Sequence, residues 1–230
     1  RISAVISEGT AGWWRTILPT GPGGVVNQRD LDQALENLRR LPSQAEARID
    51  VAPGDQHGLS DIVIHHGEAK RWHAYVGADN AGLDEMGKIQ VNAGLTLDSP
   101  LFLYDQLSVA WNSNARWRNG DANTRAASVN YNVPFGYWSF FAGASLSRYR
   151  YPLAGYAVPI FYSGTTQQLQ AGVSFVPYRG STYKGSASLT LLRKHNTNAV
   201  NDHDIAPQRR DVTGYEFSAN HRHYWGQTVW

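Results

Sequence analysis

From Trp72 onward, apolar and polar residues alternate one by one, and this alternation limits the possible fold more than any other feature of the sequence. In the clearest run, Lys88 to Leu97, every second residue from Ile89 is apolar. Side chains along a β-strand point to opposite faces in turn, so such a run predicts a strand with one apolar and one polar face. Eight segments share the pattern: Trp72–Asn80, Lys88–Leu97, Gln106–Asn112, Ala127–Phe135, Trp138–Leu146, Gln168–Phe175, Ser186–Leu191 and Tyr215–Asn220.

The lengths of these segments and of their connections are typical of a membrane β-barrel. Strands of soluble sheets have roughly 5–6 residues, whereas strands that cross a bilayer obliquely need roughly 9–11. Short turns at one rim and long loops at the other are the pattern of outer-membrane barrels. The sequence predicts short turns at Asp98–Leu103, Phe135–Tyr137 and Pro177–Ser181, and long loops at Asn112–Asp121, Tyr149–Gly164 and Arg193–Arg210. A water-soluble β-sandwich would explain the alternation, but neither the strand lengths nor the loop asymmetry.

The residues before the alternating region predict a small α+β domain. Asn27 to Leu41 has leucines and alanine at the spacing of one apolar helix face, and Asn27 is a suitable N-cap. Strands are expected at Ile2–Ser7, Ala47–Val51 and Asp61–His65, with one or two helical turns at Trp13–Leu18. If the chain enters the barrel from this domain, the short turns lie on the same side as the domain, which in a bacterial outer membrane is the periplasm.

Composition excludes several classes of protein. The 230 residues carry a net charge of +2 with 17% charged residues, which gives no electrostatic argument for a nucleic-acid partner. Without cysteine the chain has no disulfide, no thiol nucleophile and no thiolate metal site. No serine lies in a nucleophile-elbow or triad context, and nothing resembles a phosphate-binding loop. We therefore expect neither an enzyme nor a cofactor.

The ordered series of motifs resembles the two-partner secretion transporters, the haemolysin-secretion, filamentous-haemagglutinin and contact-dependent-inhibition export family of the Omp85 superfamily. The similarity covers most of the chain up to about Trp138, and the whole series is specific although each piece alone is weak. The motifs are Arg29–Leu38, Arg40–Gln44, Ala52–Gly54, Gly58–Ile64, Trp72, Asp79–Gly82, Gly87, Leu97–Leu101, Asp105–Leu107 and Pro134–Trp138.

This resemblance implies a membrane-proximal POTRA domain at residues 1–67, followed at 68–230 by about eight of the sixteen strands of an antiparallel membrane β-barrel. It implies an outer-membrane transporter, monomeric and in contact with lipid, that exports a large, unfolded partner exoprotein recognised in the periplasm. The cargo stays open between an adhesin, a haemolysin and a growth-inhibition toxin. The family's plug helix, linker, first POTRA domain and Val-Arg-Gly-Phe/Tyr loop motif do not occur in the sequence. An Omp85-type assembly factor is the alternative function, and a barrel enzyme or porin comes third.

Two groups of residues are candidates for contact with a client. A POTRA domain can receive an extended chain by strand addition at a sheet edge, and the edge predicted here is Ala47, Arg48, Ile49, Asp50 and Val51, flanked by the polar helix residues Gln33, Asn37 and Arg40. An ordinary solvated edge and helix face is the alternative. The polar rows of the strands would line the pore, as in any water-filled barrel: Lys88, Gln90, Asn92, Gln168, Gln170, Lys184, Ser186, Ser188, Glu216 and Ser218.

One pair of histidines is a weak candidate for a metal site. His221 and His223 share a strand face, but no third ligand is fixed by spacing, and catalytic zinc usually has three protein ligands. We therefore predict no metal site.

Overall fold

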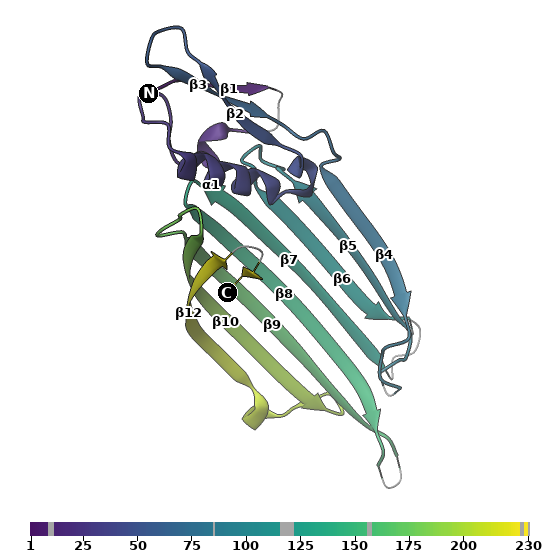
Figure 1. The fold of residues 1–230 in the computed structure, drawn as a ribbon. Helices are drawn as coiled ribbons and strands as arrows, with labels where there is room; N and C mark the ends of the chain where they lie inside the picture. Colours follow the sequence, from purple (N-terminus) through teal and green to yellow (C-terminus); the bar gives the residue numbers. More distant parts are fainter. Residues whose placement is uncertain (9–11, 85, 116–121, 156–157, 226–227, 230) are drawn as a thin grey trace.

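A computed structural model describes the chain except for residues 9–11, 85, 116–121, 156–157, 226–227 and 230. A small head lies at one end of a long, curved sheet (Figure 1). The elements of the head are β1 (Ile2–Glu8), η1 (Trp14–Thr16), α1 (Gln28–Arg39), η2 (Pro42–Gln44), β2 (Arg48–Pro53) and β3 (Ser60–His65). None of the described helices has the length and apolar character needed to span a bilayer.

The head is an α+β unit, as predicted. Its sheet has the order β1-β3-β2, with β1 parallel and β2 antiparallel to β3. The side chain of Asn27 caps α1 by accepting a hydrogen bond from the N–H of Arg29 (3.0 Å). The helix ends at Arg39, two residues before the expected end, and Pro42 begins a 3₁₀ turn there.

The apolar face of α1 packs on the head sheet and forms the main core of the molecule. Ala34, Leu38 and Leu41 of this region are fully buried, and so are Ile62 and Ile64 of β3. Burial of a large aliphatic side chain stabilises a fold by about 1.5–3 kcal/mol, so this cluster is what holds the small head together. Tyr104 also belongs to the core, although it comes from a turn of the long sheet.

The long sheet is an antiparallel meander in which each strand pairs with the next. Along the sheet the order is β4-β5-β6-β7-β8-β9-β10-β12-β13, and the short β11 pairs with β10. Eight of these strands are long, in agreement with the eight alternating segments. Their bounds are β4 (Trp72–Asp79), β5 (Gln90–Asp98), β6 (Gln106–Asn114), β7 (Asn123–Phe135), β8 (Trp138–Leu153), β9 (Ile160–Phe175), β10 (Tyr183–Val200) and β12 (Arg210–Trp225); β11 (His203–Asp204), η3 (Ala206–Gln208) and β13 (Thr228–Val229) are short.

The strands extend further from the head than the alternation predicts. β8 and β9 have 16 residues each and β10 has 18. Much of the loops expected at Tyr149–Gly164 and Arg193–Arg210 is therefore strand. The prediction was wrong there because it followed hydropathy, whereas backbone pairing continues where both faces of the strands are polar. Residues 116–121 and 156–157 of the expected loops lie outside the described residues.

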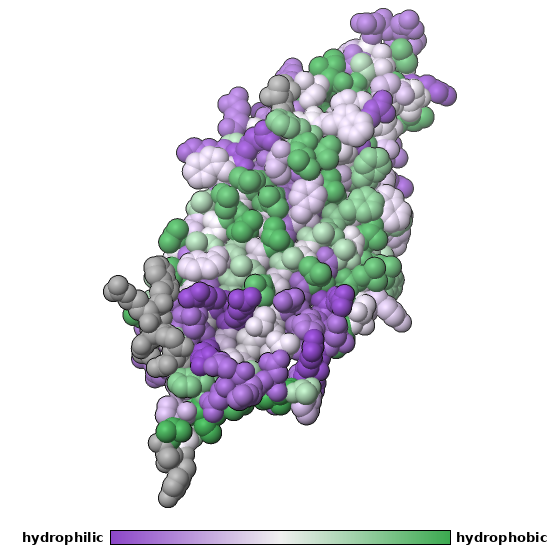
Figure 2. All heavy atoms as spheres, turned by 180° about the vertical axis from the view of Figure 1, so that it is seen from behind, coloured by the Kyte–Doolittle hydropathy of each residue, from purple (hydrophilic) through white to green (hydrophobic). Residues whose placement is uncertain are grey.

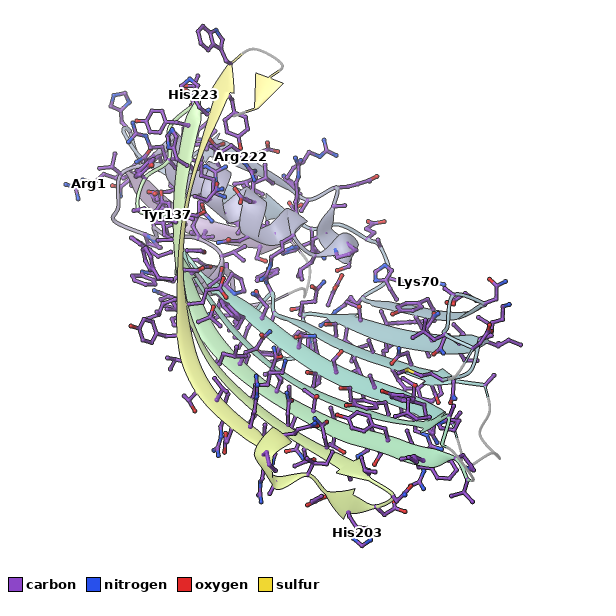
Figure 3. The ribbon with its side chains drawn as sticks, turned by 90° about the horizontal axis from the view of Figure 1, so that it is seen from below. Arg1, Lys70, Tyr137, His203, Arg222 and His223 are labelled. Atoms are coloured by element: carbon purple, nitrogen blue, oxygen red, sulfur yellow. The ribbon has the colours of Figure 1, made fainter. Side chains whose placement is uncertain are left out.

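The two faces of the sheet differ in what covers them. The sheet curves, and α1 lies across its concave side at the head end (Figures 1 and 3). Seen from behind, the convex side carries a broad apolar band, with a strongly polar region beyond it at the end away from the head (Figure 2). We call these the inner and the outer face.

Candidate functional site

The outer edge of β2 carries unpaired backbone groups. The N–H of Gly54 donates to the carbonyl of Leu59 (3.0 Å), which continues the β2–β3 register. This bond determines which residues of β2 point their N–H groups toward β3. Because residues two apart in a strand point their backbone groups to the same side, the even-numbered residues of β2 face β3. The N–H groups of Ile49 and Val51 point away from the sheet. Among the backbone hydrogen bonds of the described residues, none takes up these two groups.

The predicted edge residues differ in how accessible they are. Ala47 is buried, and Arg39 donates through Nε to its carbonyl oxygen (3.0 Å), which closes one end of the edge. Ile49 is half-buried and packs against the core of the head. The side chains of Arg48, Asp50 and Val51 are exposed. An incoming strand would thus meet the backbone of this edge along its middle and far end.

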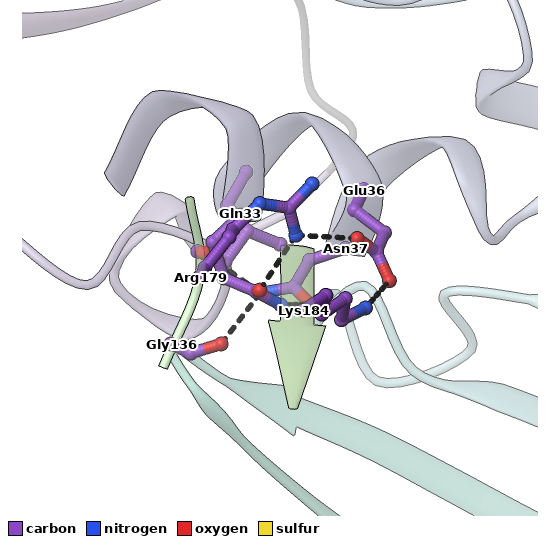
Figure 4. A network of polar contacts seen from close by, with 7 residues as sticks. Gln33, Glu36, Asn37, Gly136, Arg179 and Lys184 are labelled. Carbon is purple, nitrogen blue, oxygen red and sulfur yellow. Dashed lines mark hydrogen bonds and ion pairs between the residues drawn. The ribbon is translucent and has the colours of Figure 1, made fainter. Parts of the chain in front are cut away.

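The predicted helix residues lie elsewhere than expected. Gln33 and Asn37 are buried between α1 and the long sheet, and they do not form an open polar flank beside β2. The Asn37 amide donates to the carbonyls of Ile17 (2.9 Å) and Gly136 (2.8 Å), and its oxygen accepts from Gln33 (3.0 Å). Figure 4 shows Asn37 with Gln33 beside it on α1 and Gly136 opposite. The sequence pattern could not distinguish a solvated polar face from a polar interface.

An ion-pair cluster extends this contact to the β9–β10 turn. Glu36 pairs with both Arg179 and Lys184, and Arg179 also donates to Gln33 (3.0 Å) (Figure 4). Burial raises the pKa of the Glu36 carboxyl, but the hydrogen bonds and positive charges of Lys184 and Arg179 outweigh burial and leave that pKa below its ordinary value. The carboxylate is therefore charged at neutral pH.

The third predicted helix residue, Arg40, contacts the β5–β6 turn. Its guanidinium donates to the carbonyl of Tyr104 (2.9 Å), and burial lowers the pKa of Arg40 although Asp105 and Asp98 oppose this effect. Asp98 in turn accepts from the N–H of Ser43 (2.8 Å). Together with Tyr104 in the head core, these contacts fix the turn to the head.

Strained backbone conformations in the β5–β6 turn indicate that its surroundings hold it firmly. Ser99, Phe102 and Tyr104 all have positive φ, at 53°, 59° and 53°. Such non-glycine conformations cost of order 1–3 kcal/mol each and persist only where the surroundings enforce them. Asp105 supplies part of that enforcement, because its carboxylate accepts from the N–H groups of Leu101 and Leu103 (3.3 and 3.1 Å).

The β7–β8 turn makes the remaining contact with the head. Gly136, at a φ of 60°, donates its N–H to the carbonyl of Thr16 (2.8 Å) and accepts from Asn37. The hydroxyl of Tyr137 donates to Asp30 (2.6 Å), and burial together with this carboxylate raises the pKa of Tyr137 to about 12. Three successive turns of the long sheet are therefore bound by α1 and the residues just after it.

Nearly all the residues predicted to line a pore share the inner face. Directly paired residues of antiparallel strands lie on the same face, and the register links these positions from strand to strand. This holds for Gln90, Asn92, Gln168, Gln170, Lys184, Ser186, Ser188, Glu216 and Ser218. Lys88 differs: it precedes β5 in a loop, where its ammonium lies 3.9 Å from the Asp84 carboxylate.

A cleft of about 790 Å³ lies between α1 and the inner face. Its walls combine a row of serines with the Glu36 cluster, three further charged residues and a few apolar side chains. The serines are Ser139, Ser174, Ser186, Ser188 and Ser218, and the further charged residues are Asp32, Arg39 and Arg40. Further from the head, aromatic rings lie over glycines of neighbouring strands. Tyr75 covers Gly94 and Phe141 covers Gly172, so a Cβ at either glycine would meet the ring.

The outer face has the opposite character. Val91, Val129, Val173 and Leu189 lie on it by register, opposite to their polar neighbours along the chain. Near the head, Trp138 and Phe175 stack with ring centroids 4.2 Å apart. Aromatic residues at the border of an apolar band are typical of a protein at a membrane interface.

The two histidines considered as metal ligands belong to an aromatic group on the outer face. His221 Nδ1 lies 2.8 Å from the hydroxyl of Tyr178, and the rings of His221 and His223 are 6.3 Å apart. Within the described part of the chain, no three His, Asp or Glu side chains come close enough together to hold a metal ion. His221 is thus a hydrogen-bonding partner of a tyrosine.

Sequence reasoning missed the residues that join the head to the sheet, among them Glu36, Asp98, Tyr104 and Arg179. Asp98 and Gly136 stand in motifs that carry the family resemblance, and both are in turns. Polar residues or glycine in a short turn beside a small domain are a signal for contact with that domain. Arg179 stands in the predicted short turn Pro177–Ser181 and carries the same signal, although it is outside the motifs of the family resemblance.

Comparison with protein families identifies both parts of the chain. Residues 58–230 match the family described as haemolysin secretion/activation protein ShlB/FhaC/HecB, and residues 1–53 match the POTRA domain. The outer membrane transporter CdiB-2 of Burkholderia pseudomallei is 31% identical over 96% of this chain, and the hemolysin transporter protein ShlB of Serratia marcescens is 31% identical over 90%.

The chain spans 38% and 37% of the lengths of these two relatives. The solved structure of CdiB from Escherichia coli superimposes with a TM-score of 0.92 at 25% identity, covering all of this chain and 43% of that one. With an N-terminal POTRA match and a partial antiparallel barrel of the same form, the chain belongs to the ShlB/FhaC/HecB family of haemolysin secretion/activation proteins.

Proposed function

We propose that this chain is the POTRA domain and the first part of the barrel of an outer-membrane transporter that exports a large partner protein. The head receives the partner as an extended chain, and the barrel passes it outward. One observation carries the proposal: an unpaired strand edge in the head stands at the end of a sheet whose inner face carries rows of polar side chains. The transporter acts as a single chain, without a cofactor or nucleic acid.

The edge of β2 supports recognition by strand addition. The free N–H groups of Ile49 and Val51 can pair with the carbonyls of an incoming strand, as at any open sheet edge. Such pairing uses the backbone and therefore tolerates many client sequences. Arg39 blocks the edge at Ala47, so the client strand would begin at Ile49 and continue toward Pro53.

The inner face supports passage of an unfolded chain. The serine and glutamine side chains of this face offer weak, exchangeable hydrogen bonds to a passing chain. Short turns on the head side of the sheet support a periplasmic head, because short turns face the periplasm in bacterial barrels. Gln33, Asn37 and Arg40 hold the head in place and take no part in binding the client.

Val51→Pro in the full-length transporter tests the proposed edge. Proline removes the outward N–H at an exposed position and fixes φ, and Pro53 already occupies an equivalent outward position in the same strand. The head should fold and the barrel should insert normally, while export of the partner falls at least about tenfold, the effect of losing roughly 1.4 kcal/mol of binding. Val51→Ala, which keeps the N–H, should export normally.

The measurement is secreted partner per transporter in outer-membrane fractions. A second proline variant separates docking from folding. Asp50→Pro removes an N–H that faces β3, so it should lower transporter abundance by destabilising the head. Normal export by Val51→Pro at wild-type abundance would show that β2 is not the docking edge.

A further inference from the structure

An arginine group lies on the outer face just beyond the apolar band. Arg125 of β7 and Arg148 of β8 are direct cross-strand partners, and both side chains are exposed. Like charges in directly opposed positions destabilise a sheet. Neither arginine forms an ion pair with any other described residue. Among the described residues, these two adjacent positive charges thus have no ion-pair partner on the outer surface.

A cleft of about 380 Å³ adjoins these two arginines, and the Asp204 carboxylate lines it as well. Register places Thr165 beside Arg148 and Thr197 beside Thr165 on the same face, so hydroxyl donors border the cleft. Arg150 is next along β8, where its guanidinium pairs with Asp202 (2.6 Å). In Figure 2 the polar region beyond the apolar band is a ring of strongly hydrophilic surface around a paler centre. Arginine and hydroxyl groups together are the donor set that binds phosphate.

The height of the cleft along the strand indicates where such a phosphate would come from. The outward residues of β8 from Trp138 to Leu146 are apolar or small, and Arg148 is the first charged one. Arg148 lies about 33 Å along the strand from Trp138, or about 25 Å along the membrane normal at a tilt of about 40°. That is the height of the apolar band of an outer-membrane barrel, so the arginines lie at the level of lipid headgroups.

We infer that Arg125 and Arg148 bind a phosphate group on the headgroup of a lipid in the outer leaflet of the membrane. The two guanidinium groups donate to the phosphate oxygens, and the phosphate neutralises the charges that the sheet leaves unpaired. The inference depends on the orientation proposed above, because only a periplasmic head puts this end of the strands in the outer leaflet.

The test compares lipid binding by the full-length protein and two variants in nanodiscs. Arg125→Gln/Arg148→Gln removes both charges, and because it also removes a repulsion it should fold at least as well as the wild type. Lys194→Gln is the matched control, since Lys194 pairs with Gln168 on the inner face. The probe is a bisphosphorylated glycolipid, and its dephosphorylated form serves as the reference.

The double variant should bind the phosphorylated lipid roughly thirtyfold more weakly, about fivefold per arginine, whereas Lys194→Gln should bind it normally. All three proteins should bind the dephosphorylated lipid equally. Affinity of the double variant within twofold of the wild type would overturn the inference. Displacement of the lipid by an equal concentration of inorganic phosphate would overturn it as well, because the site would then be one for a free anion.

Two further measurements keep this inference separate from the proposed function. The lipid assay contains no partner protein, so a failure of export leaves its result unchanged. Labelling of Asp204→Cys by an impermeant maleimide on intact cells tests the orientation, since Asp204 borders the cleft and these 230 residues contain no cysteine; the unsubstituted full-length protein is the control for labelling elsewhere. Absence of labelling in cells that label after lysis would refute the outer-leaflet location.

Discussion

Replacing Asn37 by leucine should loosen both the head and its contact with the long sheet. Leucine has nearly the size of asparagine but makes none of its three hydrogen bonds, with the carbonyls of Ile17 and Gly136 and with the Gln33 amide. Each of these partners then loses its hydrogen bond with Asn37 while it remains buried. At about 1 kcal/mol for each lost bond, we expect a loss of about 3 kcal/mol.

This loss divides between the two parts of the molecule. Two of the three partners belong to the head, so about 2 kcal/mol should appear as easier local opening of the head itself. Gly136 belongs to the long sheet, so about 1 kcal/mol should appear as weaker contact between head and sheet. Hydrogen exchange measures the first part, because the exchange of α1 amides reports the free energy of local opening.

The control is Asp32→Leu, a similar substitution in the same helix at a residue for which no side-chain hydrogen bond occurs among the described residues. It should change the opening free energy by less than about 0.5 kcal/mol. The reasoning fails if Asn37→Leu changes this free energy by under 1 kcal/mol, or by no more than Asp32→Leu does.

Two other predictions follow from the ion pairs and from the register. The Glu36 pair should contribute about 1 kcal/mol to head docking, a value discounted for screening because the side chain is 45% exposed. Since the folded pKa of Glu36 is lowered, this contribution is complete above about pH 4.5 and is lost as pH falls through the folded pKa. The other turn contacts keep the head docked, so spin labels at Glu46→Cys and Ser181→Cys should show a broader distance distribution at low pH, and Glu36→Gln should abolish that pH dependence. Leu189→Arg on the outer face should destabilise the barrel in lipid by roughly 2–4 kcal/mol, and Ser188→Arg on the inner face by much less, as judged by urea unfolding of the two variants in vesicles. Equal destabilisation by these neighbours would contradict the assigned faces.

The strands of the long sheet were predictable because apolar and polar residues alternate wherever one face of a strand meets apolar surroundings. The same reasoning stopped at Leu146 in β8, since Arg148 and Arg150 break the pattern although the strand continues to Leu153. Hydropathy indicates where the apolar band ends, but the ladder of backbone hydrogen bonds does not depend on it.

The sites were less predictable than the fold. Position in the sequence shows that the β2 segment alternates, but not which of its N–H groups point outward; that depends on the phase set at Gly54 and Leu59. Likewise, Gln33 and Asn37 have the spacing of a polar helix face, and only the docked turns make that face an interface. These contacts join residues roughly a hundred positions apart, and no local sequence pattern predicts them.

The helix beside the three bound turns also has a length that matches them. With 12 residues, α1 is about 18 Å long. The β5–β6 and β9–β10 turns are four strands apart, or about 19 Å at a spacing of about 4.8 Å. Because α1 is rigid and, with the residues just after it, contacts the first, middle and last of these three turns, it fixes how the strand ends curve around it. The head therefore determines the curvature of the long sheet at this end. A tilt of α1 would move the three hairpins together.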